Sequence, residues 1–144
     1  MVDLSVGLAR GIVLKNPLVI ASGIPGVRAL MAFIREGVGA VTTKTITVEP
    51  RRGHPPPSIV RLPYGYINAV GLRNPGVDVF LEELPGLVRV AREHDSYVIV
   101  SIAGKSIKEY VELASRLEEN GVRTLGQGIP SYNNHYITNI LRAP

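Results

Sequence analysis

The sequence predicts an α/β fold in which helices cover a parallel sheet. Three continuous apolar segments have the length of strands buried on both faces, namely residues 18–22, 39–45 and 96–104. Each is followed by a segment with helical periodicity, namely residues 27–37, 76–94 and 106–121. This repeat predicts parallel pairing, because a parallel connection needs a crossover segment and the helix provides it. A doubly wound sheet and a (β/α)8 barrel both have this pattern.

Two further segments predict small hairpins outside that repeat. Residues 4–8 and 11–17 are short alternating runs at the start of the chain. Residues 49–57, with the sequence EPRRGHPPP, exclude a regular helix or a central strand because of their prolines. They lead into residues 58–71, where two β-like runs flank a turn at Tyr64.

The first two helices have clear internal signals. In the first, Leu30, Phe33 and Ile34 lie at helical spacing, and Gly37 predicts its end. In the second, we expect Pro85 to interrupt the helix, because proline removes a backbone donor and clashes with the preceding turn.

The third helix has the strongest boundary signals. Ser106 and Glu109 form a capping-box pattern, and Asn120 followed by Gly121 predicts the helix end. Apolar and small side chains are expected to form its buried face, namely Ile107, Tyr110, Val111, Ala114 and Leu117.

The character of the chain changes after Gly121. Residues 122–144 contain no continuous apolar run for a fourth strand, and polar residues, glycines and a proline interrupt them. We therefore expect two parts: residues 1–121, about the first three βα units with an N-terminal hairpin, and residues 122–144, a divergent tail that is frame-shifted or disordered. A whole (β/α)8 barrel takes about 250 residues, so a partial TIM barrel is the expected fold class.

Composition excludes several classes of function. The chain of 144 residues has no cysteine, which excludes disulfides, thiolate metal sites and a catalytic thiol within it. No apolar run is long enough for a membrane span, and the charged N-terminal segment lacks a signal-peptide core, so we expect a cytoplasmic protein. The net charge of +4 is scattered, which argues against nucleic-acid binding. His54, His94 and His135 have no carboxylates at ligand spacing, so no metal site is expected.

Candidate functional residues follow the three predicted strands. In parallel α/β folds the working residues lie at the carboxyl ends of strands. These ends are residues 21–23, 43–45 and 101–104, which are rich in small and hydroxyl-bearing side chains that let a flat ligand approach the backbone. Lys44 lies within the second end, among β-branched residues. A lysine there can neutralise an anionic ligand or stabilise electron density on a reduced ring.

Four segments resemble class 1 dihydroorotate dehydrogenases. They are NPLVIASGIPG, GAVTTKTITVEPRRGHPPP, YINAVGLRNPG and VIVSIAGKS, in order and at matching spacing over residues 4–121. The INA-x-GL-x-NPG form is most similar to the subtype that works with an iron–sulfur flavoprotein electron-transfer subunit. The resemblance implies the first part of a (β/α)8 barrel that binds FMN and oxidises dihydroorotate to orotate in pyrimidine biosynthesis. Because a partial barrel leaves two strand edges unpaired, we also expect the chain to associate with itself as a homo-oligomer.

The resemblance assigns flavin contacts at the strand ends. Ala21, Ser22 and Gly23 would lie against the flavin, and Thr45 would lie beside it. Lys44 would lie between the flavin ring and the substrate carboxylate.

The resemblance assigns substrate contacts to the segment after the second predicted hairpin. Asn68 would hydrogen-bond the pyrimidine, and Ala69, Val70, Gly71 and Leu72 would line its pocket.

The chain departs from the family where the catalytic base is expected. The family places that base, a cysteine or a serine, on a loop after a fourth strand, and nothing around Ser131 matches that loop. No catalytic residue is therefore assigned, and an incomplete, inactive form of the enzyme is expected. Two other interpretations stay open: a non-catalytic half-barrel that serves as an interaction module, and another flavin-barrel reductase of the dihydropyrimidine type.

Overall fold

The fold is built on a four-stranded parallel sheet. The computed structural model describes residues 2–8, 11–23, 25–122 and 124–127. The sheet has the order β3-β4-β7-β8, and its strands are β3 (Val19–Ile20), β4 (Ala40–Thr42), β7 (Tyr97–Ile102) and β8 (Leu125–Gln127). Every neighbouring pair is parallel. The expected α/β class, a partial (β/α)8 barrel, is confirmed.

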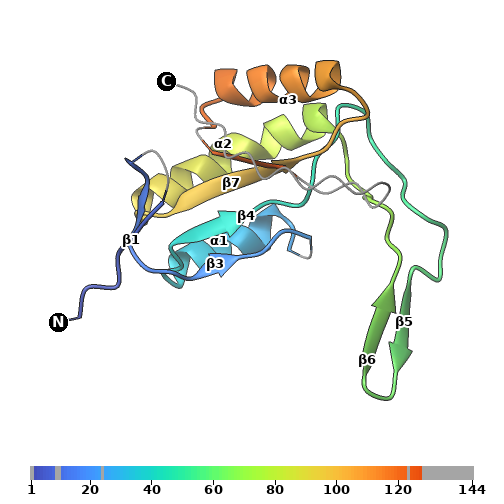
Figure 1. Ribbon diagram of the computed structural model, residues 1–144, viewed down its shortest axis with the longest axis horizontal. Coiled ribbons are helices and arrows are strands. Elements are labelled where there is room, and N and C mark those ends of the chain that lie inside the picture. The colour runs from blue at the N-terminus through green and yellow to red at the C-terminus, as the bar shows by residue number, and fades with distance from the viewer. Residues whose placement is uncertain (1, 9–10, 24, 123, 128–144) are drawn as a thin grey trace.

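Three helices pack on the sheet: α1 (Val27–Arg35), α2 (Val77–Glu93) and α3 (Ile107–Glu119). One buried cluster joins α1 and α2 to β4 and includes Leu30, Ile34, Val41, Leu87 and Val90. A second joins α2 and α3 to β7 and β8 and includes Phe80, Leu84, Val100, Leu113 and Leu117. Figure 1 shows α1 and α2 running beside the sheet and α3 beyond them. The core therefore lies on the helix side of the sheet.

The expected hairpin at the start of the chain is present, and it packs on the other face of the sheet. It consists of β1 (Val6–Gly7) and β2 (Val13–Leu14), which pair antiparallel. Its buried residues Ile12 and Leu14 form a third apolar cluster with Ala40 of β4. This hairpin covers the amino-terminal end of the sheet and leaves the carboxyl ends of the strands clear.

A second hairpin projects away from the molecule. It consists of β5 (Ile59–Leu62) and β6 (Gly65–Asn68), and the predicted turn at Tyr64 is confirmed. All eight of its strand residues are exposed. Figure 1 shows it extending away from the sheet and helices.

The expected interruption of the second helix is wrong. Helix α2 runs through Pro85 without a break. Leu84 and Leu87 on either side of the proline are fully buried against the sheet, whereas Pro85 itself is exposed. Tertiary packing outweighs the loss of one backbone hydrogen bond on the solvent side.

The buried face of α3 agrees with the expected one only in part: Leu117 is buried and Tyr110 and Ala114 pack against the core, but Ile107 and Val111 do not. Ile107 and Val111 are 84% and 59% exposed, whereas Leu113 and Leu117 are fully buried. Ile107 lies in the first turn of the helix, and Val111 lies on its outer side. The predicted cap is present, since Ser106 Oγ accepts from the backbone N–H of Glu109 at 3.3 Å. The Glu109 carboxylate accepts from the N–H of Lys105 instead of completing the reciprocal box.

The expected end of the α/β alternation at Gly121 is also wrong. Strand β8 pairs parallel with β7, with Leu125 opposite Val100. Val122 and Leu125 are buried in the core between α2, α3 and the sheet. The strand is only three residues long and includes a glycine, so its pattern is too short to recognise without the neighbour that pairs with it. The expected divergence beyond residue 127 lies outside the described residues.

Within the described residues, no helix has the length and apolar character needed to cross a bilayer.

Candidate functional site

The carboxyl ends of β3, β4 and β7 meet at one edge of the sheet. Ser22, after β3, donates its hydroxyl to the carbonyl of Thr43 at 2.7 Å. The hydroxyls of Thr45 and Ser101 share a hydrogen bond of 2.9 Å, in which either oxygen can donate. The structure therefore brings together the three strand ends that the sequence predicts as the location of functional residues.

Lys44 lies at the centre of this edge. Its side chain is half-buried, and it makes no hydrogen bond or ion pair with any described residue. The neighbouring Thr43 and Thr45 are buried. A charged ammonium held among buried residues without a partner is available to an anionic ligand.

Next to Lys44, the end of β3 forms an open surface. Ala21, Ser22 and Gly23 are all exposed. Gly23 has φ +121°, and apart from its chain neighbours no described residue has a heavy atom within 4 Å of the position that a Cβ would occupy. A flat ligand could therefore lie directly against this backbone.

The segment from Asn68 to Leu72 runs from the second hairpin back towards the sheet. Asn68 is the last residue of β6, opposite Ile59, and its side chain is exposed. The N–H of Ala69 donates to the carbonyl of Ser58 at 2.8 Å. The carbonyl of Val70 accepts from the N–H of His54 at 3.2 Å. The proline-rich connection therefore supports this segment.

Two backbone positions in the segment have left-handed conformations. Gly71 has φ +71°, and an added Cβ would lie 2.6 Å from the His54 ring and 2.9 Å from its backbone nitrogen. Leu72 has φ +54°, which is strained for a residue with a side chain. Only glycine fits at position 71, and Leu72 needs its surroundings to hold it.

Asn74 holds that strained turn against the sheet. Its side chain is buried and donates to the carbonyl of Leu72 at 2.7 Å and to the hydroxyl of Thr47 at 3.0 Å. Its Oδ1 accepts from the N–H of Gly76 at 2.9 Å and of Thr47 at 3.3 Å. The Asn-Pro-Gly motif belongs to the segments that carry the family resemblance, but the sequence predicts no role for Asn74 itself.

The two halves of the predicted site are linked only indirectly in the described part of the chain. No hydrogen bond there joins residues 68–72 to Lys44 or to residues 21–23. The connection runs through Leu72, Asn74 and Thr47, and Thr47 lies on the same segment as Lys44. Asn74 therefore sets the position of the substrate-side segment relative to the strand ends.

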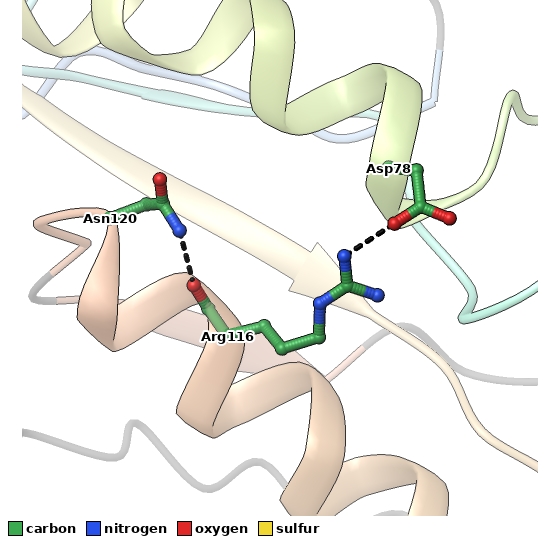
Figure 2. Close-up of polar contacts among 3 residues, drawn as sticks. All are labelled: Asp78, Arg116 and Asn120. Carbon is green, nitrogen blue, oxygen red and sulfur yellow. Dashed lines mark hydrogen bonds and ion pairs between the residues drawn. The ribbon is translucent and has the colours of Figure 1, made fainter.

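Two groups with shifted pKa values lie away from this edge. The pKa of Asp3 is lowered by hydrogen bonds from Ser5. The pKa of Arg116 is raised chiefly by its hydrogen bond with Asp78, which Figure 2 shows joining α3 to the start of α2. In the ranges that the structure describes, no three His, Asp or Glu side chains gather in a group that could hold a metal ion.

Comparisons with known proteins agree on one family. The model of the dihydroorotate dehydrogenase family matches residues 6–138. The catalytic subunit of dihydroorotate dehydrogenase B (NAD(+)) from Desulforudis audaxviator (strain MP104C) is 48% identical over 110 residues, covering 75% of this chain and 35% of that protein. The subunit of the same name from Pyrococcus abyssi (strain GE5 / Orsay) is 48% identical over 111 residues, covering 76% and 36%.

A solved structure is similar over most of the chain. The crystal structure of DHODH from Eimeria tenella in complex with ferulenol superposes with a TM-score of 0.72 and 28% identity, covering 87% of this chain and 36% of that one. The chain thus spans about a third of the length of the relatives that it matches.

Proposed function

Because the chain belongs to the dihydroorotate dehydrogenase family, we propose that it carries the flavin-facing and substrate-facing edge of an enzyme that oxidises dihydroorotate to orotate with FMN. The observation that carries the proposal is the half-buried Lys44 ammonium, without a described partner, next to the open backbone of residues 21–23. The whole reaction is part of the proposal, since the chain spans only about a third of its relatives.

The residues at the edge fit a flavin ring. Ala21, Ser22 and Gly23 present exposed backbone and small side chains, so a planar ring can approach them closely. Lys44 offers a positive charge for the electron-rich edge of the ring, and Thr45 lies beside it on the same strand end. The chemistry that FMN supplies when bound is the two-electron oxidation of dihydroorotate.

The same edge has groups suited to the substrate. Orotate and dihydroorotate carry a carboxylate, which the Lys44 ammonium would attract and orient. The exposed Asn68 side chain offers both a donor and an acceptor to the pyrimidine ring. Residues 69–72 would line the ring, with the backbone shape of Gly71 and Leu72 held by His54 and Asn74.

We also propose that the protein works in an assembly. The relatives are named catalytic subunits, which supports a partner subunit, and an iron–sulfur flavoprotein is the electron-transfer partner proposed here. The exposed apolar side chains of the β5–β6 hairpin support protein contacts, including homo-oligomer formation.

Ligand titrations test the proposal. FMN is added to the purified chain, which is dialysed and examined for retained flavin absorbance; orotate is then titrated and the flavin spectrum followed. We expect retained flavin and an orotate-dependent spectral change. Lys44→Met should weaken orotate binding by at least about tenfold, because the carboxylate loses its counter-charge. Lys108→Met, on the exposed side of α3, is the matched control and should bind normally.

Two results would count against this function. Loss of all flavin on dialysis would argue against a cofactor site in this chain. Equal orotate affinity in Lys44→Met and the unaltered chain would remove Lys44 from the substrate site.

The apolar hairpin favours a second candidate function, a non-catalytic interaction module. Both faces of β5 and β6 are exposed, including Ile59, Tyr66 and Ile67. A chain that retains no flavin but assembles through this hairpin would support that alternative.

A further inference from the structure

We propose that the hydroxyl of Thr43 is a positioning group for Lys44, because it takes the place of a backbone acceptor and forms a bulge directly after β4, where Lys44 lies. Only the last step of this inference, the effect on ligand, rests on the proposed function.

The register of β4 and β7 shows the bulge. Thr42 lies opposite Ile99, and further along Ile46 lies opposite Ile102. The chain advances four residues from Thr42 to Ile46, whereas the partner strand β7 advances only three, from Ile99 to Ile102. One extra residue is therefore inserted between Thr42 and Ile46, which is the definition of a bulge and is rare in parallel pairs.

The hydrogen bonds identify where the ladder changes. The N–H of Thr43 donates to the carbonyl of Ile99 at 2.9 Å, as a regular parallel ladder requires. The N–H of Ser101 then donates to the Thr43 hydroxyl at 3.2 Å instead of the Thr43 carbonyl. The ladder resumes at Ile46, whose N–H donates to the Ser101 carbonyl at 2.8 Å.

Both carbonyls that flank Lys44 along the chain are held by hydroxyl groups. The Thr43 carbonyl, released from β7, accepts from the hydroxyl of Ser22 on β3 at 2.7 Å. The Lys44 carbonyl accepts from the Thr43 hydroxyl at 3.1 Å. The Thr43 hydroxyl thus accepts one bond and donates another, so the backbone that carries the ammonium is fixed on both sides.

The bulge also changes which side chains share a face. Val41 and Ile46 both belong to apolar clusters on the helix side, although they are five residues apart and strict alternation would place them on opposite faces. Side chains alternate between the helix side and the opposite, inner face of the sheet. Alternation from Val41 places Lys44 on the inner face, and alternation back from Ile46 places Thr45 on the same face. The extra residue lets both neighbours serve one site while Ile46 returns to the core.

The experiment compares three variants without added ligand. Thr43→Val keeps the shape and removes the hydroxyl, and Thr43→Ser restores it. Thr42→Val makes the same change at a half-buried threonine whose hydroxyl makes no hydrogen bond with any described residue. We expect Thr43→Val to speed amide exchange at Ser101 by at least about tenfold, because a buried N–H loses its acceptor. We also expect it to move the Lys44 side-chain NMR signals towards those of a free lysine. Thr43→Ser and Thr42→Val should resemble the unaltered chain.

A ligand measurement extends the test to function. In the chain loaded with FMN, Thr43→Val should weaken orotate binding by about tenfold, with recovery in Thr43→Ser. If the unaltered chain binds neither FMN nor orotate, the proposed function fails, and the ligand-free measurements still decide the bulge.

The outcomes separate clearly. Unchanged Ser101 exchange and unchanged Lys44 signals in a folded Thr43→Val chain would overturn the inference. If Thr43→Val does not fold, Ser22→Ala decides in its place: Ser22 is exposed, and loss of its bond to the Thr43 carbonyl should still shift the Lys44 signals. Unchanged signals in Ser22→Ala would then overturn it.

Discussion

At the scale of single residues, buried hydroxyl and amide side chains hold the backbone of the candidate site in place. Thr43, Thr47, Asn74 and Ser101 are buried, and each has hydrogen-bond partners. Among the described residues no buried side-chain nitrogen or oxygen lacks a partner. Such paired groups hold irregular backbone that regular ladders cannot reach.

Removal of the Asn74 amide should destabilise the fold. In Asn74→Ala, the Gly76 N–H, the Thr47 N–H and the Leu72 carbonyl lose their partner, and we expect a loss of about 2–4 kcal/mol in the free energy of unfolding. Urea unfolding measures it. Asn120→Ala is the matched control, because that exposed amide makes one bond, to the Arg116 carbonyl in Figure 2, and its loss should cost roughly 0.5 kcal/mol or less. Equal effects in the two variants would contradict the role given to Asn74.

The sequence predicts those site residues whose chemical role follows from the residue type and its immediate neighbours. Lys44 was identified because a cation is out of place among β-branched residues, and the structure leaves it without a described partner. The sequence includes Thr43 only among the hydroxyl-bearing residues of a strand end and gives Asn74 no role, because threonine in a strand and asparagine before a proline are ordinary. Their importance lies in partners from distant segments, Ser101 and Thr47, which no local pattern reveals.

At the scale of a single helix, tertiary packing decides which face is buried. The periodicity of α3 was recognised, yet the expected face included Ile107 and Val111, which are exposed. The expected Leu117 is buried, and the expected Tyr110 and Ala114 pack against the core, but the stripe also includes Leu113, because α2 and β8 set the direction in which the helix meets the sheet.

Two truncations on α3 should differ sharply. Leu113→Ala leaves a cavity in the core and should cost about 2–5 kcal/mol. Val111→Ala removes an exposed side chain and should change stability by roughly 0.5 kcal/mol or less. Chemical unfolding of both variants measures the difference. A larger loss in Val111→Ala would mean that the helix is rotated from the orientation described here.

The ion pair between α2 and α3 should contribute little. Arg116 and Asp78 have side chains that are 32% and 81% exposed, so water screens their attraction. A double-mutant cycle with Arg116→Gln and Asp78→Asn should give a coupling of about 0.2–1 kcal/mol that falls as salt is added.

The pH dependence of that pair follows from the raised pKa of Arg116. A raised pKa means that the stabilisation is complete below the unfolded-state pKa and is lost only as pH rises through the folded-state value. Both lie far above neutrality, so the Arg116 side of the pair should give a constant coupling between about pH 6 and pH 9. A coupling that disappears within this window would contradict the assignment.

At the scale of the whole molecule, exposed apolar surface lies at the edge of the sheet and on the second hairpin. The sheet has β3 and β8 as its outer strands, and Leu18 and Val19 at the β3 edge are exposed. The β5–β6 hairpin adds further exposed apolar side chains on both of its faces. Such edges and patches favour association with other chains.

We therefore expect the chain to self-associate, with the hairpin as a major contact. Val60→Thr combined with Ile67→Thr removes a directly opposed apolar pair and keeps strand propensity, so it should shift sedimentation towards the monomer. Val79→Thr combined with Val111→Thr, at exposed helix positions, is the control and should leave the distribution unchanged. A monomeric unaltered chain over the concentration range would contradict this expectation.

The sequence by itself determined the parallel α/β repeat, both hairpins, the cap of α3 and the family, because these depend on local periodicity, turn residues and motif order. The tertiary structure alone decided the continuity of α2 through Pro85, the burial of Leu113 in place of Ile107 and Val111 on α3, strand β8 and the bulge at Thr43. Each of these depends on a partner that is distant in sequence. The energy of burying Leu84 and Leu87, or of pairing Ser101 with Thr43, outweighs the local preference only after the chain has folded.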